Sequence, residues 1–357
     1  MSLLLSLLAC TPPADLPEGE VLVADAERSE VVGKGLLLTL TEANGEPTYG
    51  ALLDSDGTVR WRRSLGGRVL RVRTPRTGEG VLVLLDRQDD DPGRIQRETF
   101  DGRLLSVTEA PEAHHDVLEL ADGRLAWLEH VEGVSPLPAN PEAPISTDIV
   151  MVGPEGGRGE PAFSFFEDYS VDPYWVCDHM EKGQRIPGHH QWTHSNSIVQ
   201  APGRDDELGV LSRNLDGLVW FDLDSGAIHD QLGGEQGTVD LGGEAFDHPH
   251  MSHAPDADTV LLFDNRLHTK EDSRVVEVAV DREAGTAEVV WSYDHPDIGN
   301  VGFLGDARRL PGGNTLIAWT DERRLTEVTP EGDIVWELRI DGIKYIGRVE
   351  LWDGPLP

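Results

Sequence analysis

Short runs of apolar residues follow one another along most of the chain. From about residue 21 onward they either alternate with polar residues or form short continuous stretches, and hardly any segment repeats with a helical period. Turn sequences separate the runs, among them Asp56-Gly57, Asp122-Gly123 and Asp216-Gly217, and such pairs favour the positive φ of tight hairpins. Short strands divided by regular turn signals are typical of an all-β fold. The pattern therefore predicts an all-β chain.

A longer repeat overlies this alternation. Strands that carry Val-Trp or a close equivalent recur at Val59-Arg60-Trp61, Val219-Trp220, Val290-Trp291 and Val335-Trp336. Each unit spans roughly 30 to 50 residues, the length of a four-stranded propeller blade. We count six units, with seven possible, near residues 35–64, 67–107, 115–165, 193–232, 250–294 and 303–340. The sequence thus predicts a six-bladed β-propeller, which we expect the strands Tyr345 to Trp352 and Glu20 to Ala24 to close by sharing a blade.

Two segments stand outside the repeat. Residues 1–20 read as a lipoprotein-type signal peptide and tether, because a short apolar run ends in Leu-Leu-Ala-Cys10 and resembles a lipobox. We expect lipidation at Cys10, a membrane anchor there, and an exported periplasmic or outer-membrane lipoprotein. Only Cys177 would then remain, so no intramolecular disulfide is expected. Residues 21–357 form the predicted propeller, with the aromatic, strandless segment 166–192 as an inserted loop.

The charge of the chain limits its partners. It carries 65 acidic against 30 basic side chains, a formal net charge of −35. A field of this sign repels nucleic acids and anionic membrane surfaces, so no nucleic-acid partner is expected.

Titratable residues precede three of the predicted strands. In a propeller the starts of the innermost strands meet at one mouth of the central channel, even when they are distant in sequence. We therefore expect the site in the channel. The candidate residues are His114, His115, His194, Asn196, Arg213, His248, His250 and His253.

This set of side chains fits an anion site with a nucleophile. Imidazole is nucleophilic at neutral pH, the planar fork of Arg213 suits a tetrahedral oxyanion, and Asn196 adds a neutral donor. A sulfate- or phosphate-like group could be held while one histidine attacks it. Two alternatives stay open: His248-x-His250-x-x-His253 could ligate zinc or copper in a metal-dependent hydrolase, or the propeller could bind a ligand or partner without catalysis.

The motifs also follow a characteristic order. They read His114-His115-Asp116, His194-Ser195-Asn196-Ser197, Ser212-Arg213 with Asp222, His250 with Phe263-Asp264-Asn265, and Leu310-Pro311-Gly312-Gly313-Asn314-Thr315-Leu316-Ile317. In this order, over roughly residues 113 to 340, the chain resembles the bacterial arylsulfate sulfotransferase family. Proline stands at position 249, where that family usually has glutamine, and the family's late lysine has only Lys344 as a nearby candidate.

The resemblance implies a six-bladed propeller that moves a sulfuryl group from a small-molecule aryl sulfate to a phenol acceptor. It implies a ping-pong mechanism through a sulfohistidine, without the nucleotide 3′-phosphoadenosine-5′-phosphosulfate, and we expect no cofactor; the chain has no phosphate-binding Gly-x-x-x-x-Gly-Lys-Ser/Thr loop. The expected catalytic residues are His250 as nucleophile, His194, Arg213 and His115. The expected substrate-binding residues are Asn196, His114, His248 and His253.

Overall fold

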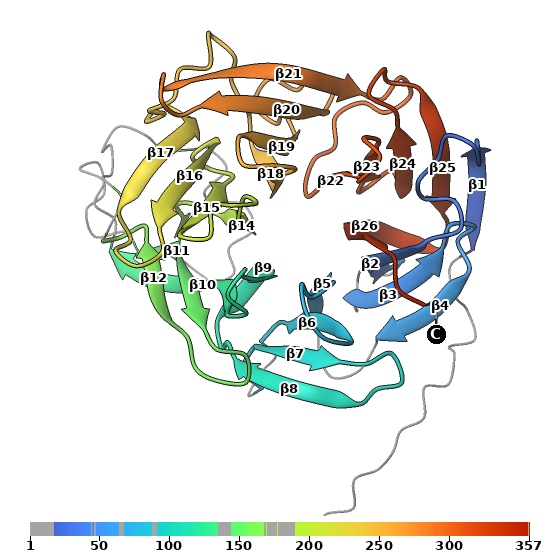
Figure 1. Ribbon diagram of the computed structural model, residues 1–357, viewed down its shortest axis with the longest axis horizontal. Coiled ribbons are helices and arrows are strands. Elements are labelled where there is room, and N and C mark those ends of the chain that lie inside the picture. The colour runs from blue at the N-terminus through green and yellow to red at the C-terminus, as the bar shows by residue number, and fades with distance from the viewer. Residues whose placement is uncertain are drawn as a thin grey trace, which may run out of the picture.

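The computed structural model describes residues 18–43, 45, 48–63, 68–87, 91–134, 144–167, 169, 177, 190–355 and 357. The predicted signal peptide with Cys10 and most of segment 166–192 lie outside these residues. The described residues form strands in six sheets and contain no α-helix. The sheets surround a central channel (Figure 1). The predicted six-bladed β-propeller is confirmed, and seven blades are excluded.

Blades 1 to 3 begin the ring, and the strands of each blade follow one another from the channel outward. Blade 1 contains β26 (Ile343–Trp352), β2 (Gly35–Glu42), β3 (Thr48–Asp54) and β4 (Val59–Arg63). Blade 2 contains β5 (Val69–Arg73), β6 (Val81–Leu85), β7 (Arg94–Glu98) and β8 (Leu104–Glu109). Blade 3 contains β9 (Ala113–Glu119), β10 (Leu125–Val134), β11 (Pro144–Gly153) and β12 (Glu160–Ser164).

Blades 4 to 6 complete the ring. Blade 4 contains β14 (Ser195–Val199), β15 (Glu207–Ser212), β16 (Gly217–Asp222) and β17 (Ile228–Gly233). Blade 5 contains β18 (Pro249–His253), β19 (Thr259–Asp264), β20 (Arg274–Asp281) and β21 (Thr286–Asp294). Blade 6 contains β22 (Asp306–Arg309), β23 (Thr315–Trp319), β24 (Arg324–Val328), β25 (Ile334–Ile340) and, outermost, β1 (Gly19–Ala24).

The two ends of the chain close the ring in different blades. The last strand, β26, pairs with β2 and becomes the innermost strand of blade 1, whereas β1 pairs with β25 at the outer edge of blade 6. The expectation that the two strands share one blade is therefore wrong. Each strand instead ties its blade to a distant part of the chain. Because β1 starts at Gly19, the propeller begins two residues before the predicted boundary.

The predicted insertion also contributes to a blade. The strand β13 (His190–Gln191) pairs in parallel with β11 at Ile145 and Ser146. The segment 166–192 is thus not strandless at its end. None of the described residues belong to a helix long and apolar enough to cross a membrane.

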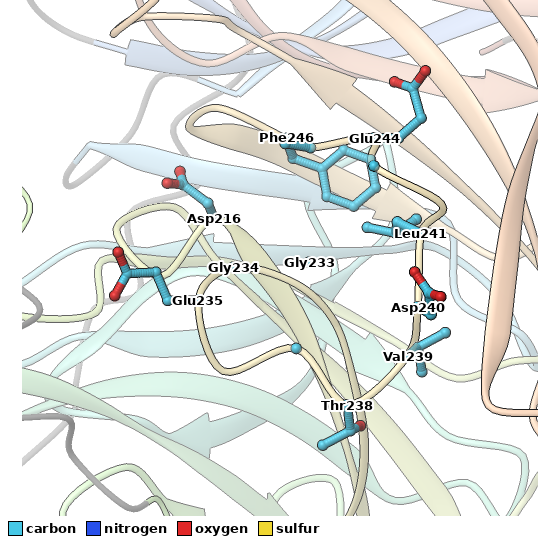
Figure 2. Close-up of a pocket in the computed structure, with 13 residues that line it drawn as sticks. Asp216, Gly233, Gly234, Glu235, Thr238, Val239, Asp240, Leu241, Glu244 and Phe246 are labelled. Atoms are coloured by element: carbon cyan, nitrogen blue, oxygen red, sulfur yellow. The ribbon is translucent and has the colours of Figure 1, made fainter.

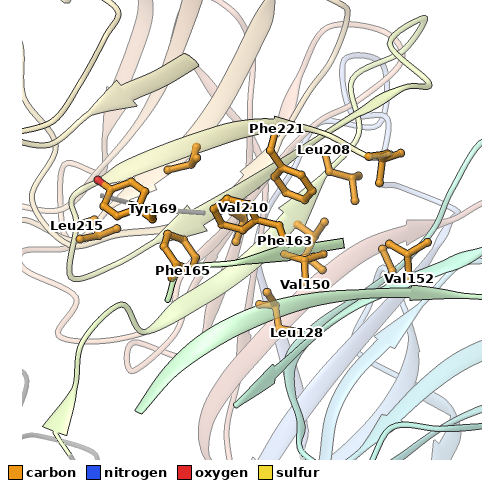
Figure 3. Packing of buried hydrophobic residues seen from close by; sticks show 14 of the residues in the cluster. Leu128, Val150, Val152, Phe163, Phe165, Tyr169, Leu208, Val210, Leu215 and Phe221 are labelled. Atoms are coloured by element: carbon orange, nitrogen blue, oxygen red, sulfur yellow. The ribbon is translucent and has the colours of Figure 1, made fainter. Parts of the chain in front are cut away.

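The hydrophobic core lies between neighbouring blades. Between blades 3 and 4, Leu128 and Val150 pack toward Val210 and Phe221 (Figure 3), and the ring of Phe221 stacks on that of Phe163 with centroids 4.6 Å apart. Because a central strand is covered on both faces, it reads as a continuous apolar run instead of an alternating one. This explains runs such as the wholly buried β6, while the outermost β21 alternates between exposed and half-buried positions.

Irregular backbone occurs where several innermost strands begin. Register shifts in β9 and β18 leave His115 and Met251 out of the regular ladder, and both residues have a left-handed φ, 53° and 51°. His194 and His248 also have positive φ, 48° and 55°. Bulges re-aim side chains and are frequent beside functional sites. The mouth of the channel is therefore where local geometry and titratable residues coincide.

Candidate active site

A cavity of about 360 Å³ opens at the end of the channel where the innermost strands begin. His115 from blade 3 and His194 from blade 4 both line it, with ring centroids 5.1 Å apart. Residues far apart in sequence thus meet at one mouth, as the propeller topology predicts. The cavity is lined by Thr39, Thr48, Arg68, Val69, Leu70, His115, Gln191, His194, Leu304, Tyr345, Gly347 and Arg348.

His250 lies buried on β18 with a defined tautomer. Its Nδ1 lies 3.0 Å from the carbonyl oxygen of Gly305, which only accepts, and 3.3 Å from Arg348 Nη1, which only donates; the shorter contact, to the carbonyl, assigns the hydrogen to Nδ1. The lone pair is then on Nε2, for which no hydrogen-bond partner is found among the described residues. Burial, followed by the positive charge of Arg348, holds the pKa of His250 well below its usual range. His250 is thus a neutral imidazole with a free lone pair, the form that a nucleophile requires.

Arg348 is a site residue that no sequence motif indicated. It lies on β26, lines the cavity and is almost fully buried. Its Nη2 donates to the carbonyl oxygen of Asn196 at 2.6 Å, and its Nη1 lies 3.3 Å from His250 Nδ1. Burial lowers the pKa of Arg348 to about 9, so it is still a cation at neutral pH.

Arg348 is therefore the cation that the C-terminal strand β26 brings to the site. Lys344, the candidate from the sequence for the family's late lysine, is exposed. A signal for this was present in the sequence. Arg348 stands between the buried apolar residues Ile346 and Val349, and a cation is rarely placed in such a position unless it has a partner or a function.

Arg213 brings a second cation to the same region. Its Nε donates to Asn214 Oδ1 at 3.0 Å, while its Nη2 is buried without a hydrogen-bond partner among the described residues. Its charge helps to lower the pKa of both His194 and His250. Neither Arg213 nor Arg348 has a carboxylate oxygen within 4.0 Å in the described part of the chain. Buried donors of this kind favour an anion.

Asn196 has a different place from the one expected. We expected it to bind substrate, but its Nδ2 donates to the carbonyl oxygen of Pro249 at 3.0 Å and its Oδ1 accepts from the backbone N–H of Met251 at 3.0 Å. Both ends of the amide therefore hold the backbone on either side of His250. The residue positions the nucleophile candidate instead of facing the cavity.

The pair His114-His115 forms a chain of hydrogen bonds. His115 lines the cavity, and its Nδ1 lies 2.7 Å from Nδ1 of His114. His114 is fully buried, with Nε2 3.1 Å from Asp148 Oδ1, and its ring stacks on His130. Burial raises the pKa of Asp148, but hydrogen bonds from His114 and His130 outweigh burial and leave the pKa well below its usual value. Of the two histidines, His115 is the one that faces the channel, and His114 links it to a carboxylate.

His194 also has an oriented ring. Its Nδ1 lies 2.5 Å from Gln191 Oε1, so an amide oxygen fixes the hydrogen on Nδ1 and Nε2 keeps the lone pair. Burial, followed by the charge of Arg213, holds the pKa of His194 well below its usual value.

His248 and His253, like His250, are not among the residues that line the cavity. His248 contacts Asp247 and Cys177, and burial, followed by the charges of Arg308 and Arg73, lowers the pKa of His253 to about 3. The three histidines of His248-x-His250-x-x-His253 therefore have different neighbours and do not converge on one point. Among the described residues these three histidines form no common metal group, which argues against the alternative of a zinc or copper site there, while substrate binding by His248 and His253 stays a prediction.

A layer of paired charges fills the channel beneath the cavity. Arg71 is fully buried and lies 3.3 Å from Asp116, 3.6 Å from Asp306 and 2.5 Å from Glu350. Arg73 and Arg308 contact the same carboxylates. We call the six residues Arg71, Arg73, Arg308, Asp116, Asp306 and Glu350 the arginine–carboxylate layer. It makes the floor of a site that opens toward one end of the channel.

The family model of the arylsulfotransferases (ASST) matches residues 23–319. The chain belongs to the arylsulfotransferase family. The family suggested by the order of the motifs is thereby confirmed. No curated protein matches this chain.

Several solved structures share the architecture of this chain. A protein of unknown function from Bacteroides caccae is 15% identical with a TM-score of 0.56 and covers 90% of this chain and 99% of its own. The periplasmic gluconolactonase PpgL from Pseudomonas aeruginosa is 14% identical with a TM-score of 0.52, covering 91% and 99%. TolB from Acinetobacter baumannii is 9% identical with a TM-score of 0.56, covering 89% and 67%. At these identities the likeness shows the fold alone.

The chain has a second hollow, of about 580 Å³, formed by Asp216 and the loop around residues 233–246 (Figure 2). The side chains of Asp216, Glu235, Asp240 and Glu244 surround it. Carboxylates repel a sulfate ester. The channel cavity, which is lined by Arg348 together with His115 and His194, is the better site for the family's chemistry.

Proposed function

We propose that this arylsulfotransferase moves a sulfuryl group from an aryl sulfate ester to a phenol by a ping-pong mechanism with His250 as nucleophile. The observation that carries the proposal is the combination at His250 itself. Its Nε2 has no hydrogen-bond partner among the described residues while Nδ1–H faces the Gly305 carbonyl, and the charges of Arg348 and Arg213, which have no described carboxylate oxygen within 4.0 Å, both lower its pKa. A nucleophile beside uncompensated cations suits an anionic electrophile.

In the first half-reaction the Nε2 lone pair of His250 attacks sulfur. An N–S bond forms, and the S–O bond to the aryl group breaks, so that the aryl oxide leaves with the electron pair and takes up a proton. Arg213 and Arg348 stabilise the charge on the sulfuryl oxygens, and one such well-placed donor contributes on the order of 3 kcal/mol.

His115 is the proposed donor of that proton. It faces the cavity and continues through His114 to Asp148. A carboxylate that stays ionised stabilises a proton held on the histidine pair. In the second half-reaction a phenol loses its proton to this pair and attacks sulfur, and the S–N bond breaks to restore neutral His250.

His194 has a different role in this scheme. Its depressed pKa makes it a poor acid, and its Nε2 lone pair suits a hydrogen bond that orients the hydroxyl group of the incoming phenol before the proton passes to the His114–His115 pair.

Intact-protein mass spectrometry tests the proposal. The wild type is incubated briefly with 4-nitrophenyl sulfate, without a nucleotide, and compared with His250→Asn. Asparagine keeps a donor for the Gly305 carbonyl but has no atom in place of Nε2, so the variant is matched in shape. The control variant is His253→Asn, on the same strand but outside the cavity.

The expected result is an adduct of one sulfuryl group with release of nitrophenol in the wild type and the control, and neither in His250→Asn. An adduct that persists in His250→Asn contradicts the assignment of the nucleophile. No adduct and no nitrophenol with several aryl sulfates contradicts the activity, and the ligand-binding propeller without catalysis would then be preferred.

We also propose that the chain is exported as a lipoprotein. The support is the sequence alone, since the Leu-Leu-Ala-Cys10 motif lies outside the described residues. Expression of the wild type and Cys10→Ser in a bacterium that processes lipoproteins tests this. A lipid-sized mass increase on a chain that begins at Cys10, absent from Cys10→Ser, is expected, and an unmodified wild type would refute it.

A further inference from the structure

Three metal-ligating side chains converge outside the channel cavity. Cys177 Sγ lies 3.1 Å from His248 Nε2 and 3.9 Å from His268 Nε2, and the two imidazole rings are 4.3 Å apart between centroids. We call these three residues the Cys–His–His cluster. They come from three separate parts of the chain: Cys177 from segment 166–192, His248 from the approach to β18, and His268 from the connection between β19 and β20.

A single carboxylate orients both histidines of the cluster. Asp247 Oδ1 lies 3.0 Å from Nδ1 of His248 and 3.3 Å from Nδ1 of His268. Asp247 Oδ2 accepts backbone N–H groups from His268 and Thr269, each at 2.8 Å, so the carboxylate itself is fixed. With Nδ1 directed at a carboxylate, each histidine presents Nε2 toward the thiol. Metal-ligating histidines are held in this way by an outer carboxylate.

The spacing of the donor atoms fits a metal ion. Zinc–sulfur bonds of about 2.3 Å and zinc–nitrogen bonds of about 2.0–2.1 Å at tetrahedral angles place sulfur and nitrogen roughly 3.5 Å apart. The observed separations of 3.1 and 3.9 Å lie on either side of this value. Cys177 and His248 are buried, while His268 is exposed on one side, which leaves a direction of entry for an ion.

Other clusters among the described residues fit a metal less well. In the set His114, His130 and Asp148 the carboxylate lies at hydrogen-bonding distance from both rings, 3.1 and 3.2 Å. It also accepts from Thr193 and from the backbone of Ser195, so its oxygens are already used. The set Asp216, Asp247 and His248 uses the carboxylate that orients the Cys–His–His cluster.

We propose that Cys177, His248 and His268 bind one zinc ion, with Asp247 as the residue that positions both histidines. One thiolate and two imidazoles are a borderline-soft set, which selects zinc or copper over magnesium and calcium. Zinc is preferred because it needs no redox partner. The ion would join Cys177 to the approach of the strand that carries His250, two residues beyond His248.

Metal content is the test, because it does not depend on sulfuryl transfer. The wild type is stripped with a chelator, reloaded with zinc sulfate, desalted and measured by elemental analysis together with Cys177→Ser, His268→Ala and His130→Gln. Cobalt(II) is loaded in parallel, since a thiolate ligand gives a charge-transfer band in the near ultraviolet. Circular dichroism shows whether each variant is folded.

One zinc per chain is expected in the wild type and in His130→Gln, with loss of zinc and of the cobalt thiolate band in Cys177→Ser. In Asp247→Asn we expect a rise of about 10- to 100-fold in the zinc dissociation constant. A folded wild type that retains no zinc overturns the proposal, as does a zinc ion that survives in both Cys177→Ser and His268→Ala. Stoichiometric binding of copper in preference to zinc overturns the choice of metal.

Discussion

Two groups of buried arginines occupy the same channel and differ in one respect. In the arginine–carboxylate layer three guanidinium groups face three carboxylates, and Arg71 alone contacts all three. At the mouth, Arg213 and Arg348 have no carboxylate oxygen within 4.0 Å among the described residues. Burial of a charge costs free energy unless a group of opposite charge lies beside it. The arginine–carboxylate layer therefore stabilises the fold, whereas Arg213 and Arg348 are suited to binding an anionic ligand.

The largest effect is expected in the paired layer. Arg71→Met leaves Asp116, Asp306 and Glu350 buried around an uncharged side chain, and loss of one partner from a buried pair costs about 3–5 kcal/mol of unfolding free energy. Urea denaturation checks this. The matched control is Arg103→Met, which breaks an exposed pair with Glu79 and should leave stability unchanged. Equal stability of the two variants would show that the layer is not structural.

Substitution of an arginine at the mouth of the channel should lower the activity and leave the stability of the fold largely unchanged. Arg213→Gln removes a donor proposed to act on the sulfuryl oxygens, so kcat/KM for 4-nitrophenyl sulfate should fall about 10²- to 10³-fold. Among the described residues no carboxylate oxygen lies within 4.0 Å of Arg213, so the unfolding free energy should fall much less than in Arg71→Met. Steady-state kinetics and urea denaturation measure both. A loss of stability like that of Arg71→Met, with activity retained, would place Arg213 with the structural arginines.

His253, at the edge of the arginine–carboxylate layer, should make the stability of the fold depend on pH. Burial and the charges of Arg308 and Arg73, opposed by Glu350, lower the pKa of His253 to about 3. The unfolded chain binds a proton below about pH 6.5, so the stability present above that pH is lost as the pH falls toward the folded pKa.

Between about pH 7 and pH 5 this loss amounts to as much as ~2 kcal/mol. The variant His253→Gln should lack this part of the decline. Urea denaturation of both proteins at the two pH values measures it. An identical decline in the two proteins would show that His253 is not held neutral by the layer.

The smallest effect concerns binding of the anion itself. Sulfate at ten times its dissociation constant should stabilise the wild type by about 1.4 kcal/mol, because it neutralises the unpaired cations at the mouth. Thermal unfolding in sodium sulfate is compared with sodium chloride at equal ionic strength. Sulfate also stabilises proteins through exclusion from their surface, and the variant Arg213→Gln measures that general effect. Equal sulfate responses in both proteins would argue against an anion site at the mouth.

Much of the fold could be predicted because the signals are local. Turn pairs, apolar runs and the recurring Val-Trp strands mark each blade within its own stretch of sequence, and hairpin neighbours pair in order. The ring closure could not be read in the same way. Pairing of β26 with β2 joins residues more than 300 positions apart, such as Trp352 and Gly35, and no local pattern specifies that register.

The sequence predicted the location of the candidate site better than the roles of its individual residues. The propeller topology brings the starts of the innermost strands together, so His115 and His194 could be expected at one cavity. The role of Asn196 depends on hydrogen bonds to the backbone of the next blade, which the sequence does not record. Arg348 and His268 stand in no motif and acquire their neighbours only when the ring closes.

The sequence by itself determined the strands, the six-fold repetition, the family and the residue types available for chemistry, because these follow from short-range patterns of side chains. The tertiary structure decided which charges are paired. An arginine in β5 finds carboxylates from β9, β22 and β26, whereas one in β26 finds a histidine of β18 and a carbonyl group of β14. A buried arginine stabilises the fold when carboxylate oxygens lie within a few ångströms of its guanidinium group, and otherwise it is suited to binding an anion. The closure of the ring sets the distances between these groups.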